Sequence, residues 1–212
     1  MNELKIEKTV RFATHGNPKT AKNIWIVLHG YGQLPAFFIR KFHGLDPVEN
    51  FVVAPEGMHR FYLEGTSGRV GASWMTKEAR EHDISDNNNY LNTLWKQLES
   101  NFQFENKILL GFSQGGATAA RWHEAGSFNA QHFVLWASVF PPDLTFNPQK
   151  STFNSSKNYF ALGEQDPYYD EAKRREMFNR INQLDFETLT FEGKHDIDSV
   201  TLNDIAKLIS FS

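Results

Sequence analysis

Residues 108–120, ILLGFSQGGATAA, place a serine between glycines at the point where an apolar run gives way to small residues. The block Gly111-Phe112-Ser113-Gln114-Gly115 fits the pattern G-x-S-x-G, in which a serine occupies a strained turn from a strand into a helix. Side chains two positions to either side would collide there, so both positions require glycine. A helix N-terminus behind the hydroxyl favours the negative charge that develops beside it. We therefore interpret Ser113 as a nucleophile and not as a turn residue.

A serine hydroxyl is a poor nucleophile at neutral pH and needs a general base, usually a histidine that a carboxylate holds in one tautomer. After a serine in such a turn, the acid and then the histidine follow at the carboxyl ends of later strands. Of the eight histidines, only His195 follows both Ser113 and a further strand-helix unit. Asp166 closes a short turn after an apolar run, and we prefer it to Glu164. The sequence thus predicts a catalytic triad of Ser113, Asp166 and His195.

Stabilising the oxyanion of a tetrahedral intermediate needs two backbone N–H donors. We expect one from Gln114, the residue after the nucleophile. The second is expected from Tyr31, in the loop His29-Gly30-Tyr31-Gly32 that follows the apolar run at 24–28. This leaves His29 as a structural residue.

The composition narrows the chemistry further. The chain has no cysteine, which excludes disulfides, thiol catalysis and zinc held by cysteine. Asp196 and Asp198 beside His195 give only a weak signal of metal binding and are interpreted as solvated, so we predict neither a metal nor a cofactor. The net charge of −3, without any block of lysine or arginine, argues against a nucleic-acid partner.

Short apolar runs alternate with turns and helical patterns, which predicts an α/β class with a mostly parallel sheet. With 212 residues we expect a single domain over 1–212. A helix carrying Leu91 and Leu94 is expected to start at Ser85 or Asp86, and 141–158 is expected to be a long surface loop. The predicted strands are 24–28, 51–54, 108–110, 133–137, 159–162 and 188–191, and two further helices are expected near 170–184 and around Ile205 to Ile209.

No stretch of the sequence approaches the ~20 apolar residues that a membrane-spanning helix needs. The N-terminal MNELKIEKTVRF alternates charged and apolar residues and lacks the pattern of a secretory signal. We therefore expect no transmembrane segment and a cytoplasmic protein. Its oligomeric state is left open.

From about Asn23 to the C-terminus the chain resembles the phospholipase/carboxylesterase family of α/β hydrolases, which includes bacterial carboxylesterases and acyl-protein thioesterases. The resemblance implies a mostly parallel central sheet flanked by helices, without a large lid domain. It also implies a cofactor-free hydrolase of carboxylic esters or thioesters, with the triad and oxyanion donors named above. The residues that carry it are His29-Gly30-Tyr31-Gly32, Ala54-Pro55-Glu56, Ser73-Trp74, the family-specific block GFSQGG at 111–116, Gly163 with Asp166, and Gly193 with His195.

The substrate-facing positions depart from the family pattern. Gln33, Met75-Thr76-Lys77 and Tyr168-Tyr169 replace its usual residues, so the substrate stays open. Three aromatic residues between positions 60 and 74 either shape a substrate pocket or belong to the core: Phe61, Tyr62 and Trp74. The leading hypothesis is a serine hydrolase that cleaves esters or thioesters of short to medium acyl chains, with a small-molecule or acylated ester as substrate. The alternatives are a serine peptidase or amidase on the same fold and a non-catalytic binding protein.

Overall fold

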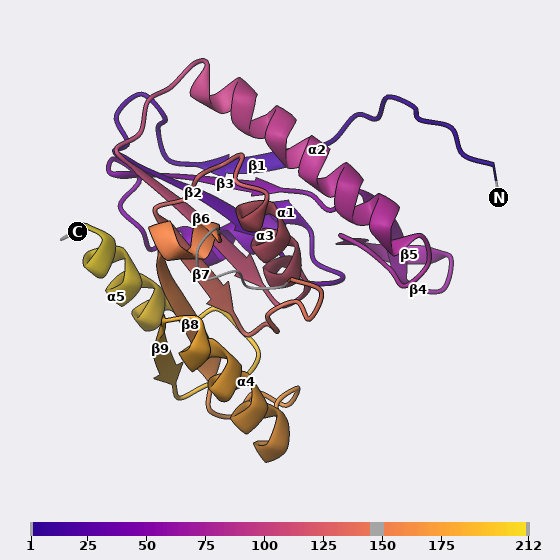
Figure 1. Ribbon diagram of the computed structural model, residues 1–212. Coiled ribbons are helices and arrows are strands. Elements are labelled where there is room, and N and C mark those ends of the chain that lie inside the picture. Colours follow the sequence, from indigo (N-terminus) through magenta and orange to yellow (C-terminus); the bar gives the residue numbers. More distant parts are fainter. Residues whose placement is uncertain (1, 145–150, 211–212) are drawn as a thin grey trace.

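The computed structural model describes residues 2–144 and 151–210, and a seven-stranded sheet organises this part of the chain. Its strand order is β1-β3-β2-β6-β7-β8-β9, and all neighbouring strands are parallel except β1 and β3 (Figure 1). The predicted mostly parallel sheet is therefore confirmed. The strands are β1 (Phe12–His15), β2 (Asn23–Leu28), β3 (Asn50–Pro55), β6 (Asn106–Phe112), β7 (His132–Trp136), β8 (Lys157–Gly163) and β9 (Phe186–Phe191).

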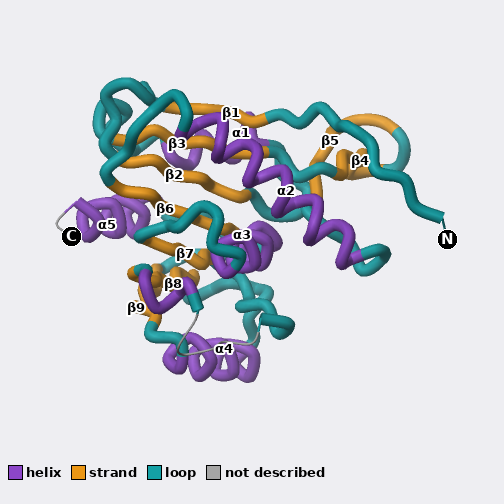
Figure 2. Tube along the Cα trace, turned by 45° about the horizontal axis from the view of Figure 1, so that its top comes forward, coloured by secondary structure: helices purple, strands orange, loops and turns teal. Residues whose placement is uncertain are grey.

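Helices cover the sheet and complete the predicted α/β architecture. In Figure 1, α2 and α3 lie across the front of the sheet, while α4 lies beside β8 and β9 at the bottom; Figure 2 shows the same elements with the top of the molecule tilted forward. Within the described residues, none of the helices is long and apolar enough to cross a membrane. The helices are α1 (Pro35–Phe38), α2 (Arg80–Glu99), α3 (Gln114–Glu124), α4 (Glu171–Gln183) and α5 (Ser199–Ser210), with 3-10 turns at Ile39–Phe42 and Thr152–Ser155.

The strand order places a switch point between β2 and β6. From β2 the chain moves outward to β3, returns through α2 to β6, and then moves outward in the other direction through β7, β8 and β9. Because the strand order reverses there, the carboxyl ends of β2 and β6 open a crevice in which α/β proteins bind ligands. The two segments that leave this point are the loop containing Tyr31 and the turn containing Ser113.

Three strands were not predicted, and each lacks the continuous apolar run that marks a buried strand. β1 is half exposed, and the hairpin of β4 (His59–Glu64) and β5 (Ser67–Ser73) is mostly solvent-facing along β4. This hairpin projects beside the start of α2 in Figure 1. Its base is joined to the loop after β2, since the Gly32 N–H donates to the Ala72 carbonyl and the Ala72 N–H donates to the Gln33 carbonyl.

Two other predictions were wrong in detail. α2 begins at Arg80, five residues before Ser85, the earlier of the two expected caps, because its first residues are mostly polar and carry no apolar periodicity. Asp83 in that turn accepts a hydrogen bond from the Thr76 N–H and so ties the helix start to the preceding loop. In the predicted surface loop, 145–150 lie outside the described residues, but Phe153 is only 3% exposed and packs edge-on against Phe133.

Three buried histidines make the fold sensitive to acid. His29, His123 and His132 are at most 3% exposed, and burial lowers the pKa of each to about 4. In the unfolded chain a histidine has a pKa near ~6.5, so the unfolded state takes up protons between about pH 6.5 and 4 that the native state does not. The contribution of the three neutral histidines to the free energy of unfolding is therefore complete above about pH 6.5 and is lost as the pH falls toward 4.

We expect the urea midpoint to drop between pH 7 and 4.5, with each such histidine contributing up to about 3 kcal/mol. His132→Phe keeps the ring that stacks on Tyr159 and should make the pH dependence shallower. The matched control is His82→Phe, because the His82 side chain is 58% exposed and should leave the slope unchanged. Equal slopes in wild type and His132→Phe would contradict the assignment.

Candidate active site

Ser113 sits at the tip of a tight turn between β6 and α3. Its backbone is in a strained conformation with φ 53° and ψ −123°, which a non-glycine residue adopts only where the surroundings enforce it. A Cβ at Gly111 would lie 2.5 Å from the Gly116 Cα, and one at Gly115 would lie 2.4 Å from the Leu28 carbonyl oxygen. The predicted need for glycine on both sides of the serine is thereby confirmed.

The end of β7 holds the backbone of this turn in place. The Ser113 N–H donates to the Trp136 carbonyl at 2.9 Å, and the Ser138 hydroxyl donates to the Ser113 carbonyl at 2.6 Å. Ser138 is 4% exposed, so this hydrogen bond is shielded from water. Ser138 is not among the residues predicted from sequence; its position directly after a predicted strand, at the carboxyl edge of the sheet, was the available signal.

The structure brings Ser113, His195 and Asp166 into one hydrogen-bonded chain. The Ser113 hydroxyl lies 2.9 Å from His195 Nε2, and His195 Nδ1 lies 2.7 Å from Asp166 Oδ2. Since the carboxylate only accepts, Nδ1 carries the proton and donates to Asp166, which leaves Nε2 free to accept from the serine. The Asp166 side chain is fully buried, whereas that of His195 is 18% exposed.

Backbone contacts between the loops after β8 and β9 set the spacing of Asp166 and His195. The Gln165 N–H donates to the Gly193 carbonyl at 2.8 Å. The two loops pack so closely that a Cβ at Gly163 would lie 2.5 Å from the carbonyl oxygens of Gly193 and Lys194. Asp166 is held further by the Tyr168 N–H, which donates to its second carboxylate oxygen at 2.9 Å.

Of the two aspartates after His195, Asp196 is exposed, as the sequence interpretation expected, whereas Asp198 is half-buried and has a capping role. Asp196 pairs with Lys41 Nζ at 2.6 Å. Asp198 accepts from the N–H and hydroxyl of Thr201 and caps the start of α5. Across 2–144 and 151–210, no group of three or more metal-ligating side chains is arranged around a common point.

Trp136 connects the nucleophile turn to the histidine loop. Its carbonyl accepts from Ser113, while its fully buried indole N–H donates to the Asp196 carbonyl at 2.9 Å, one residue after His195. Trp136→Phe leaves the backbone carbonyl in place but removes this second hydrogen bond and part of the buried ring, so we expect kcat to fall about fivefold with KM nearly unchanged.

The matched control for this variant is Trp25→Phe, which removes the buried indole hydrogen bond to Asn50 in β2 and β3. It should cost similar stability without lowering kcat. Steady-state kinetics and urea unfolding of both variants make the comparison. An equal loss of kcat in the two variants would show that Trp136 acts through stability alone.

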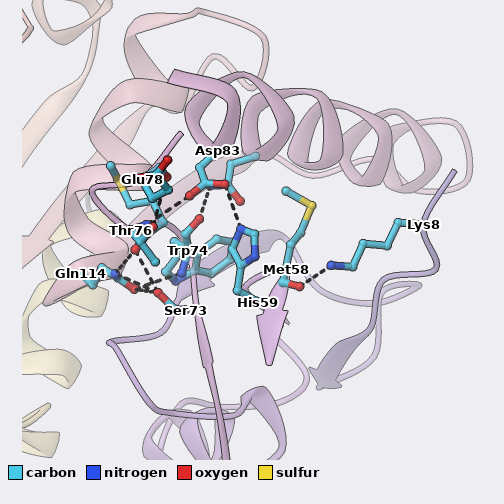
Figure 3. A network of polar contacts seen from close by, with 11 residues as sticks. Lys8, Met58, His59, Ser73, Trp74, Thr76, Glu78, Asp83 and Gln114 are labelled. Carbon is cyan, nitrogen blue, oxygen red and sulfur yellow. Dashed lines mark hydrogen bonds and ion pairs between the residues drawn. The ribbon is translucent and has the colours of Figure 1, made fainter. Parts of the chain in front are cut away.

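Gln114 begins α3, so its backbone N–H is among those without a helical acceptor. Its side chain is anchored to the segment after β5, as Figure 3 shows: Oε1 accepts from the Trp74 N–H at 3.0 Å and Nε2 donates to the Met75 carbonyl at 2.9 Å. The segment that Gln114 binds is also hydrogen-bonded to α2, because Asp83 of that helix accepts from the Thr76 N–H. Asp83 accepts a second hydrogen bond from His59. These contacts fix the start of α3 behind the serine.

The loop with Tyr31 lies against the serine from the other side. A Cβ at Gly30 would lie 3.2 Å from the Ser113 Cβ. His29 is fully buried, and its Nε2 accepts from the Gly57 N–H while its Nδ1 donates to the Gly30 carbonyl, in keeping with the structural role expected of it. Tyr31 is 61% exposed and its ring lies 5.0 Å from that of Phe61, so its side chain points to the hairpin and not to the serine. The role of its backbone N–H as an oxyanion donor stays a prediction.

A cavity of about 560 Å³ opens beside Ser113 and His195. One wall is the loop from Ala137 to Pro142 and the other is the start and inner face of α4. The three aromatic residues considered from sequence do not line it: Trp74 is fully buried and donates to the His29 carbonyl, and Phe61 and Tyr62 lie on the hairpin. Tyr168 and Tyr169, which depart from the family pattern, do line it.

Fold and site together define a serine hydrolase of the α/β-hydrolase class, and comparison with known proteins gives the family. The chain belongs to the serine hydrolase (FSH1) family, whose profile matches residues 20–199. No curated protein matches the chain. The fold is that of several solved hydrolases, so the predicted fold class is confirmed.

Three of these solved structures illustrate the likeness. A carboxylesterase from Mesorhizobium loti has a TM-score of 0.72 at 13% identity, over 93% of this chain and 94% of that one. An acyl-protein thioesterase 2 from Zea mays has a TM-score of 0.70 at 14% identity, over 94% and 97%. A Bacillus cereus carboxylesterase has a TM-score of 0.68 at 15% identity, over 95% and 93%.

Proposed function

We propose that this serine hydrolase cleaves carboxylic esters or thioesters of short to medium acyl chains through an acyl-enzyme intermediate. The observation that carries the proposal is the hydrogen-bonded chain from the Ser113 hydroxyl through His195 to Asp166. The cavity beside it, about 560 Å³ and walled largely by apolar side chains, is of a size that receives a medium acyl chain. The likeness in fold to carboxylesterases and an acyl-protein thioesterase supports the same substrate class.

In the proposed reaction His195 Nε2 takes the hydroxyl proton as Ser113 Oγ attacks the acyl carbonyl carbon. The buried Asp166 carboxylate stabilises the imidazolium that forms. The backbone N–H groups of Gln114 and Tyr31 hold the oxyanion, and the positive end of α3 adds to this stabilisation. His195 then returns the proton to the leaving alcohol or thiol, and water repeats the cycle on the acyl-enzyme.

Hydrolysis rates on three matched substrate series test the proposal: p-nitrophenyl esters, thioesters and p-nitroanilides of the same acyl groups. We expect turnover of the esters or thioesters, little of the anilides, and a rate optimum at short to medium chains. Ser113→Ala provides the background rate. Faster cleavage of the anilides would make the protein an amidase, and ester turnover that persists in Ser113→Ala would refute the proposal.

A further inference from the structure

The cavity beside Ser113 has a charged group that the proposed ester hydrolysis does not use. Lys173, Glu176, Met177 and Arg180 of α4 line the cavity and recur at helical spacing, so they share one face of the helix. From Lys173 to Arg180 this face rises about 10 Å along the helix axis. α4 follows shortly after Tyr168, whose ring lies 4.5 Å from that of His195, so the start of α4 is the end nearer the catalytic residues and Arg180 lies at the far end of the cavity.

Arg180 joins the two walls at that end. It donates one hydrogen bond from Nη2 to the Pro141 carbonyl at 3.0 Å, and its guanidinium lies over the Phe140 ring, 5.3 Å from the centroid. An arginine has five N–H donors in a fixed fork. Among residues 2–144 and 151–210, no carboxylate oxygen lies within 4.0 Å of the Arg180 guanidinium nitrogens, the distance that defines an ion pair. The half-buried guanidinium of Arg180 therefore has further N–H donors available to a ligand in a largely apolar cavity.

The other charges along the wall do not supply a counter-ion. Lys173 lies 3.8 Å from Asp170 and so has a partner of its own at the rim. Glu176 is exposed and adds negative charge beside the middle of the cavity, which disfavours an anion there. An anionic group is therefore favoured only at the Arg180 end, where guanidinium and carboxylate can pair through two parallel hydrogen bonds.

We infer that the enzyme prefers acyl groups that end in a carboxylate, that is, monoesters or monothioesters of dicarboxylic acids, and that Arg180 binds this distal carboxylate. The inference rests on the proposed function, since the acyl carbonyl must lie at Ser113. The apolar stretch past Met177 accommodates the methylene chain, and the carboxylate reaches Arg180 only when the chain spans the cavity.

Pairs of substrates that differ only in the terminal group test the inference. The pairs are p-nitrophenyl hydrogen adipate against p-nitrophenyl hexanoate, and p-nitrophenyl hydrogen suberate against p-nitrophenyl octanoate; shorter diacids are avoided because their own carboxylate attacks the ester. Wild type should have the higher kcat/KM on the carboxylated member of at least one pair. Salt should reduce this preference by screening the charge.

Arg180→Gln should lower the preference for the carboxylated ester about tenfold or more through KM, and leave the methyl-terminated ester within about twofold. The control, Arg175→Gln, removes the same charge from an exposed position on α4 and should keep the preference. No preference in wild type, or an equal loss on both esters in Arg180→Gln, would overturn the inference. Failure to cleave any ester would instead refute the proposed function.

Discussion

His195→Ala should abolish turnover, with a loss of kcat of up to about a million-fold on the best ester substrate. In a triad the serine and histidine act as a unit, so removing the histidine costs nearly as much as removing the nucleophile. In this protein His195 Nε2 lies 2.9 Å from the Ser113 hydroxyl, and its ring contacts those of Phe112 and Tyr168; among the described residues no second histidine is hydrogen-bonded to Ser113.

The control for this variant is His82→Ala, which removes an exposed histidine at the start of α2. It should keep full activity. Circular dichroism and urea unfolding establish that both variants are folded, and stopped assays at high enzyme concentration measure the residual rate. Near-normal turnover of His195→Ala would mean that another group is the base.

Asp166→Asn should lower kcat about ten-thousand-fold while the fold persists. The asparagine oxygen can still accept from the Tyr168 N–H, as Asp166 Oδ1 does. Its amide nitrogen would then face His195 Nδ1, where Asp166 Oδ2 now accepts at 2.7 Å. An N–H at this position makes Nδ1 an acceptor, moves the ring proton to Nε2, and leaves no lone pair to take the proton of Ser113.

Asp170→Asn is the matched control for Asp166→Asn. Asp170 is the N-cap of α4 and accepts from the Lys173 N–H, a role that asparagine also fills. The control should therefore keep both stability and activity. The kcat of each variant on one ester, with NMR of the imidazole N–H proton, measures the effect. If the kcat of Asp166→Asn stayed within about tenfold of the wild-type value, the carboxylate would have no essential role in the mechanism.

The central strands of the fold could be predicted from sequence because buried parallel strands appear there as unbroken runs of apolar residues. β2 and β8 are examples, and G-x-S-x-G marks its own turn through the two glycines that sterics require. The chain order then singled out Asp166 and His195, and the structure places His195 within hydrogen-bonding distance of Ser113 and Asp166 within that distance of His195.

What sequence reasoning missed depends on contacts between distant segments. The hairpin of β4 and β5 is exposed along much of its length and so carries no apolar alternation. The hydrogen bond from the Trp136 indole to the histidine loop joins residues 60 positions apart. Likewise, Arg180 becomes a cavity residue only because α4 packs opposite the loop at 137–142, which no local pattern encodes.

Reaction with a fluorophosphonate tests the central claim, the nucleophilic Ser113, most directly. Intact-mass and peptide mass spectrometry of the treated protein should show one adduct, located on Ser113, in wild type. Ser113→Ala should stay unlabelled, and Ser138→Ala, which keeps the nucleophile but removes the hydroxyl that holds its carbonyl, should be labelled more slowly. A wild-type protein without adduct, or an adduct that persists in Ser113→Ala, would contradict the account.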